Sequence, residues 1–126
     1  MNILLKRVYE TPEPSDGFRI LVDRLWPRGM LKISAHIDLW HKDIGPSTPL
    51  RKWFGHDPSR WIEFQERYIL ELRNNPDAVE QITVQVRRGL VTFVYAAKNK
   101  EHNHALVLKE YLENTTKRSG NGLGEN

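Results

Sequence analysis

The sequence predicts a small single-domain α/β fold, in which a largely parallel sheet is flanked by helices. Three observations lead to this prediction. The chain has 126 residues, which is the usual size of one domain. Two short runs, residues 18–25 and 90–96, are almost continuously apolar, as strands buried on both faces are. Between and after these runs lie segments whose apolar residues recur at helical spacing.

Three segments are predicted to be strands: residues 3–9, 18–25 and 90–96. A turn rich in Pro, Asp and Gly separates the first two. Pro27 and Gly29 end the second strand, because proline cannot donate to a sheet ladder. The third strand reads LVTFVYA, a β-branched and aromatic run that is typical of a buried strand. If the second and third strands are parallel, their carboxyl ends share the sheet edge where open α/β folds bind ligands.

Helices are predicted over four segments: residues 49–54, 58–73, 76–88 and 103–113. Thr48 and Asp57 stand directly before prolines, in the order of an N-cap followed by a first helical residue. Within the third segment, the alternation of Ile82, Val84 and Val86 also fits a strand, and we prefer the helix. Residues 30–48 show no clear pattern.

The predicted domain covers residues 1–113. Residues 114–126 are polar and rich in glycine and lack periodicity, so we expect a flexible C-terminal tail. The composition, 39% hydrophobic and 10% aromatic, is that of a globular protein.

The net charge and the absence of cysteine limit which partners and which kinds of chemistry the protein can have. Lys and Arg outnumber Asp and Glu by 19 to 16, a net charge of +3, and this basic balance suits an anionic partner. There is no cysteine, so thiolate chemistry and disulfides are excluded, and a reducing compartment is favoured. The first apolar run is too short for a signal peptide, and no stretch approaches the about 20 apolar residues of a membrane helix. We therefore expect a cytoplasmic location and no membrane partner.

Several familiar signatures are missing. The chain has no GxSxG, Walker A or GxGxxG pattern, so the motifs of serine hydrolases, P-loop enzymes and dinucleotide-binding domains are absent. His102 and His104 are two residues apart and would not share a helix face, which makes them poor joint metal ligands. We predict neither a metal site nor a cofactor.

Polar side chains follow both apolar strands. Asp23, Arg24, Trp26 and Arg28 come after the apolar core of the second strand, residues 20–22, and Asn103 and His104 come after the third strand. The fold prediction brings the two groups to one edge of the sheet. Arginine forks suit carboxylates and phosphates, and tryptophan rings can stack on a base or a sugar.

These residues, and three more from the predicted short helix and the segment after it, have candidate roles in binding or proton transfer. The predicted ligand-binding residues are Arg24, Trp26, Arg28, Arg51, Trp53 and Asn103. The predicted candidates for proton transfer are Asp23, His56 and His104. Structural alternatives stay open for these roles: Asp23 could pair with Arg24 or Arg28 to fix the loop, and Arg28 could be a surface charge. The tryptophans could plug the ends of the sheet, and His56 could be a structural residue beside a helix cap.

Several strings of the chain resemble one family: RVYE, DGFRILVDRLWPRG, LWHKDIGPSTPLRKWFGHDPSRW, FQERYILEL, VTFVYAAK and HNHALVLKEYL. They span residues 6–112 and are similar to the YeaO-like group of bacterial and archaeal proteins, a domain-of-unknown-function family. The resemblance implies a compact α/β domain and supplies no function. It also implies that mostly polar and aromatic residues form the family pattern, among them Asp23, Arg24, Trp26, Arg28, Trp40, Arg51, Trp53, His56, Asn103 and His104.

Two positions depart from the family pattern. Asn99 stands where the resemblance leads us to expect an Asp, and a site that used this Asp as a base would be impaired. Gly45 stands where Ala is usual, which we expect to be a minor loop change.

Three functional hypotheses remain. The leading one is a site for a small phosphate-bearing or nucleotide-like anion at the carboxyl edge of the sheet. The second is a non-enzymatic module that binds nucleic acid or protein, and it predicts a contiguous basic surface. The third is a purely structural role for these residues. The sequence names no reaction and leaves open both enzymatic activity and the oligomeric state.

Overall fold

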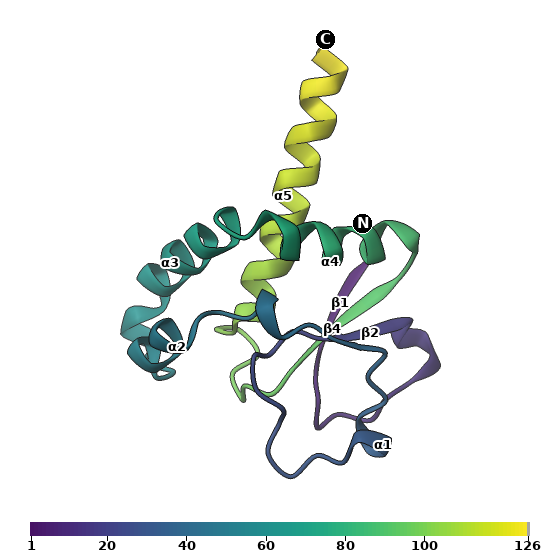
Figure 1. Ribbon diagram of the computed structural model, residues 1–126, viewed down its shortest axis with the longest axis vertical. Coiled ribbons are helices and arrows are strands. Elements are labelled where there is room, and N and C mark those ends of the chain that lie inside the picture. Colours follow the sequence, from purple (N-terminus) through teal and green to yellow (C-terminus); the bar gives the residue numbers. More distant parts are fainter. Residues whose placement is uncertain (126) are drawn as a thin grey trace.

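A parallel four-stranded sheet organises the molecule (Figure 1). The computed structural model describes the backbone of residues 1–125 and the side chains of residues 1–115. The strands are β1 (Ile3–Arg7), β2 (Phe18–Leu21), β3 (Leu39–Trp40) and β4 (Val91–Tyr95), in the order β1-β4-β2-β3. All three pairings are parallel. The predicted α/β fold with a largely parallel sheet is therefore confirmed.

The last strand along the chain lies inside the sheet. Val91 is in register with Ile3 of β1 on one side and with Phe18 of β2 on the other. All five residues of β4 are buried. This burial on both faces explains why the sequence of β4 is continuously apolar instead of alternating.

Five α-helices and three short 3-10 helices connect and cover the strands. They are η1 (Pro14–Asp16), α1 (Lys32–Ala35), η2 (Lys42–Ile44), α2 (Thr48–Phe54), η3 (Pro58–Arg60), α3 (Trp61–Arg73), α4 (Pro76–Arg88) and α5 (His104–Glu125). Residues from α2, α3, α4 and α5 pack against one face of the sheet, together with Ile20 of β2 and Phe93 of β4. No helix in the described part of the chain is long and apolar enough to cross a membrane.

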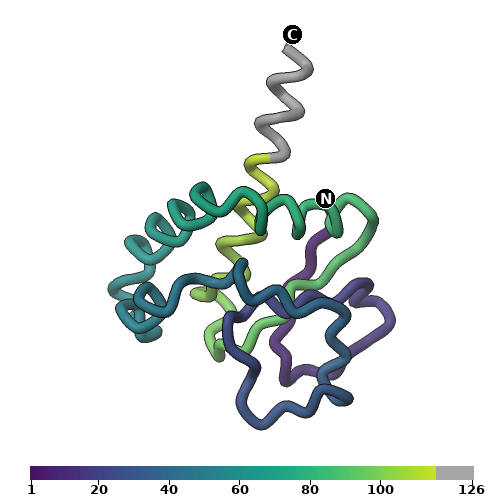
Figure 2. Tube along the Cα trace, in the orientation of Figure 1, coloured from purple at the N-terminus to yellow at the C-terminus, as the bar shows by residue number. Residues whose placement is uncertain are grey.

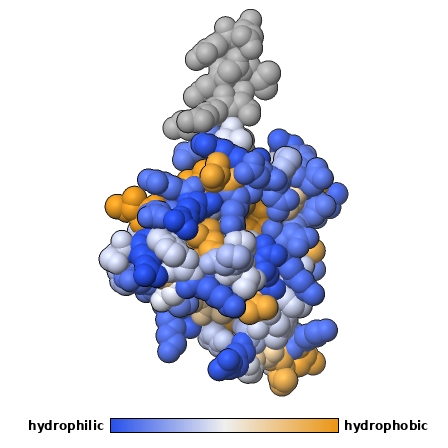
Figure 3. All heavy atoms as spheres, turned by 60° about the vertical axis from the view of Figure 1, so that its left-hand side comes forward, coloured by the Kyte–Doolittle hydropathy of each residue, from blue (hydrophilic) through white to orange (hydrophobic). Residues whose placement is uncertain are grey.

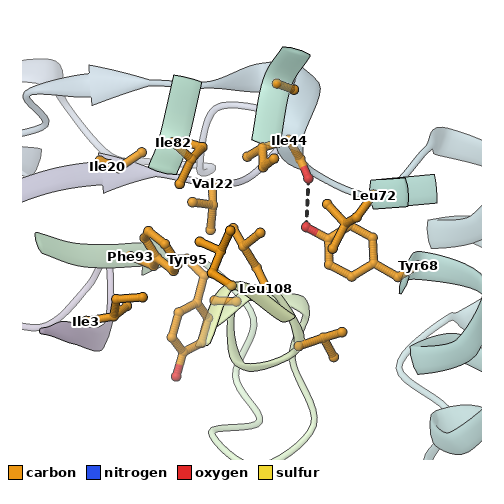
Figure 4. Packing of buried hydrophobic residues seen from close by; sticks show 14 of the residues in the cluster. Ile3, Ile20, Val22, Ile44, Tyr68, Leu72, Ile82, Phe93, Tyr95 and Leu108 are labelled. Atoms are coloured by element: carbon orange, nitrogen blue, oxygen red, sulfur yellow. Dashed lines mark hydrogen bonds between the residues drawn. The ribbon is translucent and has the colours of Figure 1, made fainter. Parts of the chain in front are cut away.

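The main core lies under these helices (Figure 4). Ile20, Val22 and Phe93 point from the sheet toward side chains of α3, α4 and α5. The buried Tyr68 hydroxyl donates a 2.7 Å hydrogen bond to the Ile44 carbonyl, so its polar end is satisfied inside the core. Burial, reinforced by the charges of Glu71 and Asp23, raises the pKa of Tyr68 far above its usual range and keeps this donor protonated.

A smaller core covers the opposite face of the sheet. Leu21 and Val94, which alternate with the residues of the main core, pack there with Val8 and Ala35. The ring of Trp26 closes this core and meets Trp40 edge to face at 5.3 Å. The segment between β2 and β3 thus covers the second face mainly as a loop with one short helix.

Most predicted elements are present, with shifted ends. The structure confirms a helix over α4 and not the alternative strand. The second strand was predicted too long, because β2 ends at Leu21 and the chain turns away after one more ladder bond, from the Val22 amide to the Val94 carbonyl. Thr48 was predicted to be the N-cap of α2, and this prediction is wrong by one residue. The N-cap is Ser47, whose side chain accepts a hydrogen bond from the Leu50 amide. The short elements α1 and β3 fall in residues 30–48, where no pattern of apolar residues predicts an element.

The final helix differs from its predicted range. It begins at His104, one residue after the predicted start, and α5 continues to Glu125. The side chains of residues 116–126 lie outside the described part of the molecule, and the expected flexible tail over residues 114–126 stays a prediction.

Candidate functional site

The carboxyl end of β2 is the meeting point of four segments. Asp23 follows this strand, and its carboxylate Oδ2 accepts a 3.0 Å hydrogen bond from the Ala96 amide at the end of β4. Its backbone carbonyl accepts a 2.8 Å bond from the Trp40 indole of β3. Its second carboxylate oxygen, Oδ1, lies 3.0 Å from Nε2 of His104, the first residue of α5. Figure 2 shows the segments after β2 and β4 side by side.

The Asp23–His104 pair brings a carboxylate and an imidazole together at this edge. Each side chain is only 14% exposed. His104 Nε2 also lies 3.1 Å from the Val22 carbonyl, so one ring nitrogen faces two acceptors. The hydrogen bond goes to the carbonyl, and Asp23 Oδ1 is buried beside the ring nitrogen without a hydrogen-bond partner of its own. The Val22 carbonyl and the neighbouring carboxylate together orient the imidazole, a side chain that can donate or accept a proton.

Arg24 fastens the neighbouring loop. Its Nε donates to the Pro46 carbonyl at 3.0 Å and its Nη2 to the Gly45 carbonyl at 2.8 Å. A weaker contact of 3.9 Å reaches the exposed carboxylate of Asp43. Two of its nitrogens are therefore already used for the fold, although its positive charge remains at the edge.

The loop held by Arg24 passes unusually close to the backbone of β2. A Cβ at Gly45 would lie 2.9 Å from the Arg24 amide nitrogen and 3.0 Å from the Val22 carbonyl oxygen. Both contacts are with backbone atoms, so an alanine here would require the loop or the residues after β2 to shift.

The two tryptophans predicted to stack on a ligand, Trp26 and Trp53, already make contacts with other residues of the protein. The Trp26 indole donates a 2.6 Å hydrogen bond to the Met30 carbonyl and packs in the smaller core. The ring of Trp53 lies beneath the guanidinium groups of Arg60 and Arg67, which are 5.3 Å and 4.3 Å from its centre. A base or sugar would have to displace one of these arginines to stack on Trp53.

Arg28 and Arg51 differ from Arg24 in their surroundings. Arg28 is exposed on the turn after Pro27, and only its backbone carbonyl is bonded, by the Tyr9 hydroxyl at 3.0 Å. Arg51 is partly buried on α2. Among the described residues, neither guanidinium makes a hydrogen bond or an ion pair. These two cations are consequently available to a ligand.

His56 is not at the Asp23–His104 pair. It is exposed after the end of α2 and has the left-handed backbone conformation, with φ of 58°. Its ring lies 5.9 Å from that of Phe54, which contacts Trp61, and Trp61 stacks on His102 at 4.9 Å. The predicted proton-transfer set is therefore divided between two places.

Asn103 holds the loop that leads into α5. Its Oδ1 accepts a 3.0 Å bond from the Leu106 amide, and its Nδ2 donates to the carbonyls of Asn99 and Lys100. Asn99 in turn accepts from the amides of Glu101 and His102. An Asp at position 99 could accept the same two bonds, so Asn99 preserves the turn while removing a titratable carboxylate.

We expect Asn103→Ala to lower the free energy of unfolding by about 2 kcal/mol, since it removes a helix cap and leaves two carbonyls without donors. Asn103→Asp keeps the acceptor for the cap and should cost about half as much. Urea denaturation of the two variants beside the wild type measures both values. Equal losses would show that the cap contributes little.

Sequence reasoning missed Trp40 and Tyr68 as parts of this site. Trp40 bonds the Asp23 carbonyl, and the ring of Tyr68 meets His104 edge-on at 6.1 Å. Trp40 belongs to the family pattern, which was the available signal, whereas Tyr68 looked like an ordinary core residue of its helix. In the described part of the chain, no three His, Asp or Glu side chains gather as metal ligands would.

Comparison with known proteins identifies the family. A family model described as "Inactive DUF488-N3 subclade" matches residues 2–125. The chain is 46% identical to the uncharacterized protein YeaO of Escherichia coli K12 over 112 residues, which cover 89% of this chain and 97% of that protein. It is 40% identical to the uncharacterized protein Rv3073c of Mycobacterium tuberculosis over 111 residues, 88% of this chain and 93% of the relative. No solved structure matches the chain. The chain therefore belongs to the YeaO-like DUF488 family.

Proposed function

We propose that this domain binds a small anion, phosphate-bearing or nucleotide-like, at the carboxyl edge of its sheet and does not turn it over. The observation that carries the proposal is a pair of arginines without partners, in the two segments that follow Arg24 and Pro46 along the chain. Arg28 and Arg51 have no partner among the described residues, while Arg24 is bonded to two carbonyls. Unpaired guanidinium groups beside a rigid sheet edge attract an anion and can bind it in a bidentate manner.

Chain length limits how far each arginine can lie from Asp23 and Arg24. Arg28 follows Arg24 by four residues, which span at most about 14 Å even when fully extended. Arg51 follows Pro46, whose carbonyl Arg24 holds, by five residues, and most of these lie in α2 with a rise of about 1.5 Å each. The residues beside Arg51 pack in the main core and those beside Arg28 in the smaller core, so the two arginines would reach an anion at the edge from opposite faces of the sheet.

The charge balance around Asp23 and Arg24 also supports an anion. Arg24, Arg28, Arg51 and Lys42, which lies over the Trp40 ring, contribute four positive charges. Asp23, Asp43 and Glu71, which bonds Ser47, contribute three negative charges, which leaves +1 when His104 is neutral. Asp43 is largely exposed, so water screens its charge. The carboxylate of Asp23 is held by the Ala96 amide and His104, and it serves to orient the site.

Two observations support binding without turnover. The matching family model is described as an inactive subclade. Asn99 also carries no titratable group at the position where the family resemblance implies an Asp. Within this proposal, Asp23 and His104 position the edge of the sheet, and His56 stands apart from it.

The test is a thermal-shift titration with inorganic phosphate, adenosine 5′-monophosphate and short single- and double-stranded DNA. A bound anion at 100 times its dissociation constant should stabilise the protein by about 2.7 kcal/mol. The Arg28→Gln/Arg51→Gln variant should lose this shift. Arg87→Gln/Arg88→Gln, which removes two exposed charges of α4, should keep it.

Equal shifts in wild type and in Arg28→Gln/Arg51→Gln would overturn the assignment of the site, and no shift with either small anion would overturn the proposal. Stabilisation by DNA alone, with a steep dependence on salt, would point instead to the nucleic-acid alternative.

A further inference from the structure

Two exposed apolar surfaces differ in charge. The first is the segment of residues 24–37, called here the basic loop, which contains Arg28 and Lys32 and no acidic residue. Leu31 and Ile33 of this loop are 68% and 81% exposed. The exposure of two large aliphatic side chains so close together is unfavourable in water and typical of a contact surface.

The second surface is a groove of about 590 Å³ on the outer side of α3, called here the α3 groove. It is lined by Ser59, Ile62, Glu63, Glu66, Arg67 and Leu70. Ile62 and Leu70 are 71% and 56% exposed. Figure 3 faces the side of α2 and α3, and it shows hydrophobic atoms on this side and at the lower end of the molecule, where Figure 1 places α1.

The α3 groove is acidic where a partner would meet it. Arg67 is paired with Glu63 and lies over the ring of Trp53, so its charge is already engaged. Glu66 makes no ion pair among the described residues. A cation that approaches beside Leu70 therefore meets a free carboxylate.

The basic loop is rigid enough to present its side chains. Beneath it, the Trp26 indole bonds the Met30 carbonyl, and the buried Arg19 bonds the carbonyls of Ala35 and His36. The Tyr9 hydroxyl bonds the Arg28 carbonyl. Because the backbone is held in place, little conformational entropy is lost when Leu31 and Ile33 become buried.

We propose that the chain associates with a second copy of itself, in which the basic loop of one copy docks into the α3 groove of the other. Leu31 and Ile33 cover Ile62 and Leu70, and Lys32 pairs with Glu66. The opposite charges of the two surfaces favour this contact over loop-to-loop or groove-to-groove pairing, which would bring like charges together. Arg24 and Arg28 belong to the basic loop and add to its positive charge, but the residues tested below, Leu31, Lys32, Ile33, Ile62, Glu66 and Leu70, are not among those assigned to the anion, so either proposal can fail without the other.

The contact joins two different surfaces, and each copy carries both. It closes into a two-fold dimer when two copies exchange loops, because each then fills the groove of the other. Each contact is centred on only four aliphatic side chains, so we expect a small interface of the weaker class.

Sedimentation velocity from roughly 1 to 300 µM covers the affinities of such interfaces. The wild type should shift from monomer to dimer over this range. Leu31→Ser/Ile33→Ser and Ile62→Ser/Leu70→Ser should each remain monomeric, while Leu4→Ser, an exposed residue of β1, should associate like the wild type. A 1:1 mixture of the two double variants should associate again, more weakly than the wild type, because it restores one of the two loop–groove contacts of the dimer.

Charge reversal gives a second readout. Lys32→Glu and Glu66→Lys should each weaken association at least about tenfold, and combining them in one chain should restore it. Circular dichroism checks that each variant is folded. Three outcomes would overturn the proposal: a wild type that is monomeric throughout the range, association that survives both double variants, or a mixture that stays monomeric.

Discussion

Replacing Asp16 with alanine is expected to lower the free energy of unfolding by about 3–5 kcal/mol, because it leaves a buried arginine without its counter-charge. Asp16 and Arg19 are both 3% exposed, and their carboxylate and guanidinium lie 2.6 Å apart. Asp16 also accepts bonds from the Glu13 amide and from Lys6. Denaturation in urea at pH 7 measures the loss.

The same carboxylate makes stability depend on pH. Burial alone would raise the pKa of Asp16, but hydrogen bonds from the Glu13 amide, Lys6 and Arg19 together lower it below the ordinary value of 3.8. A lowered pKa adds stability that is fully present above the ordinary value and is lost as the pH falls through the folded-state pKa. The wild type should therefore lose more stability than Asp16→Ala as the pH falls below about 4.

A surface pair provides the control. Glu63 and Arg67 form an ion pair one helical turn apart on α3, and both side chains are 51% exposed. Glu63→Ala should cost less than about 1 kcal/mol, since water screens the pair. A similarly small loss for Asp16→Ala would show that Lys6 and rearranged water replace the buried contact.

The second large effect is expected at Gly17. This residue has φ of 67° and ψ of −140°, a conformation that is open almost only to glycine. A Cβ here would also lie 2.4 Å from the Leu90 carbonyl oxygen, which accepts the Phe18 amide where β2 and β4 begin to pair. Gly17→Ala should lower the free energy of unfolding by more than about 3 kcal/mol, as measured by thermal or urea denaturation.

A substitution at Gly29 distinguishes the cost of the backbone conformation from the cost of the contact with Leu90. Gly29 also has a positive φ, 78°, but a Cβ there would meet no atom within 4 Å. Gly29→Ala should therefore cost only about 1–2 kcal/mol, the penalty of the left-handed backbone alone. Equal losses at the two positions would mean that the contact with Leu90 relaxes without cost.

The long elements of the fold could be predicted because their sequences carry local signals. Pro76 opens α4 and Gly89 follows its end, and the apolar run of β4 reflects its central place in the sheet. β3 could not be predicted, because two residues are too few to show an alternation. Its position is set by long-range bonds, such as that from the Asp38 amide to the Arg19 carbonyl.

The site was predictable in its location and less so in its details. The rule for parallel strands brought Asp23 and His104 to one edge, and the structure places them 3.0 Å apart. The same rule could not show that the Arg24 guanidinium would donate hydrogen bonds to the carbonyls of Gly45 and Pro46. Such bonds join a side chain to the backbone carbonyls of a distant segment without regular structure, and the spacing of residues along the sequence carries no information about them.

The strand order determines how much of the sheet can form while the chain is still being synthesised on the ribosome. β4 separates β1 from β2, so the two strands made first share no ladder of their own. Until β4 emerges, only the two-residue pairing of β2 with β3 is available to the nascent chain. Sheet assembly must therefore wait until most of the chain has been synthesised, and the unpaired backbone edges of β1 and β2 stay accessible to chaperones and proteases during that time.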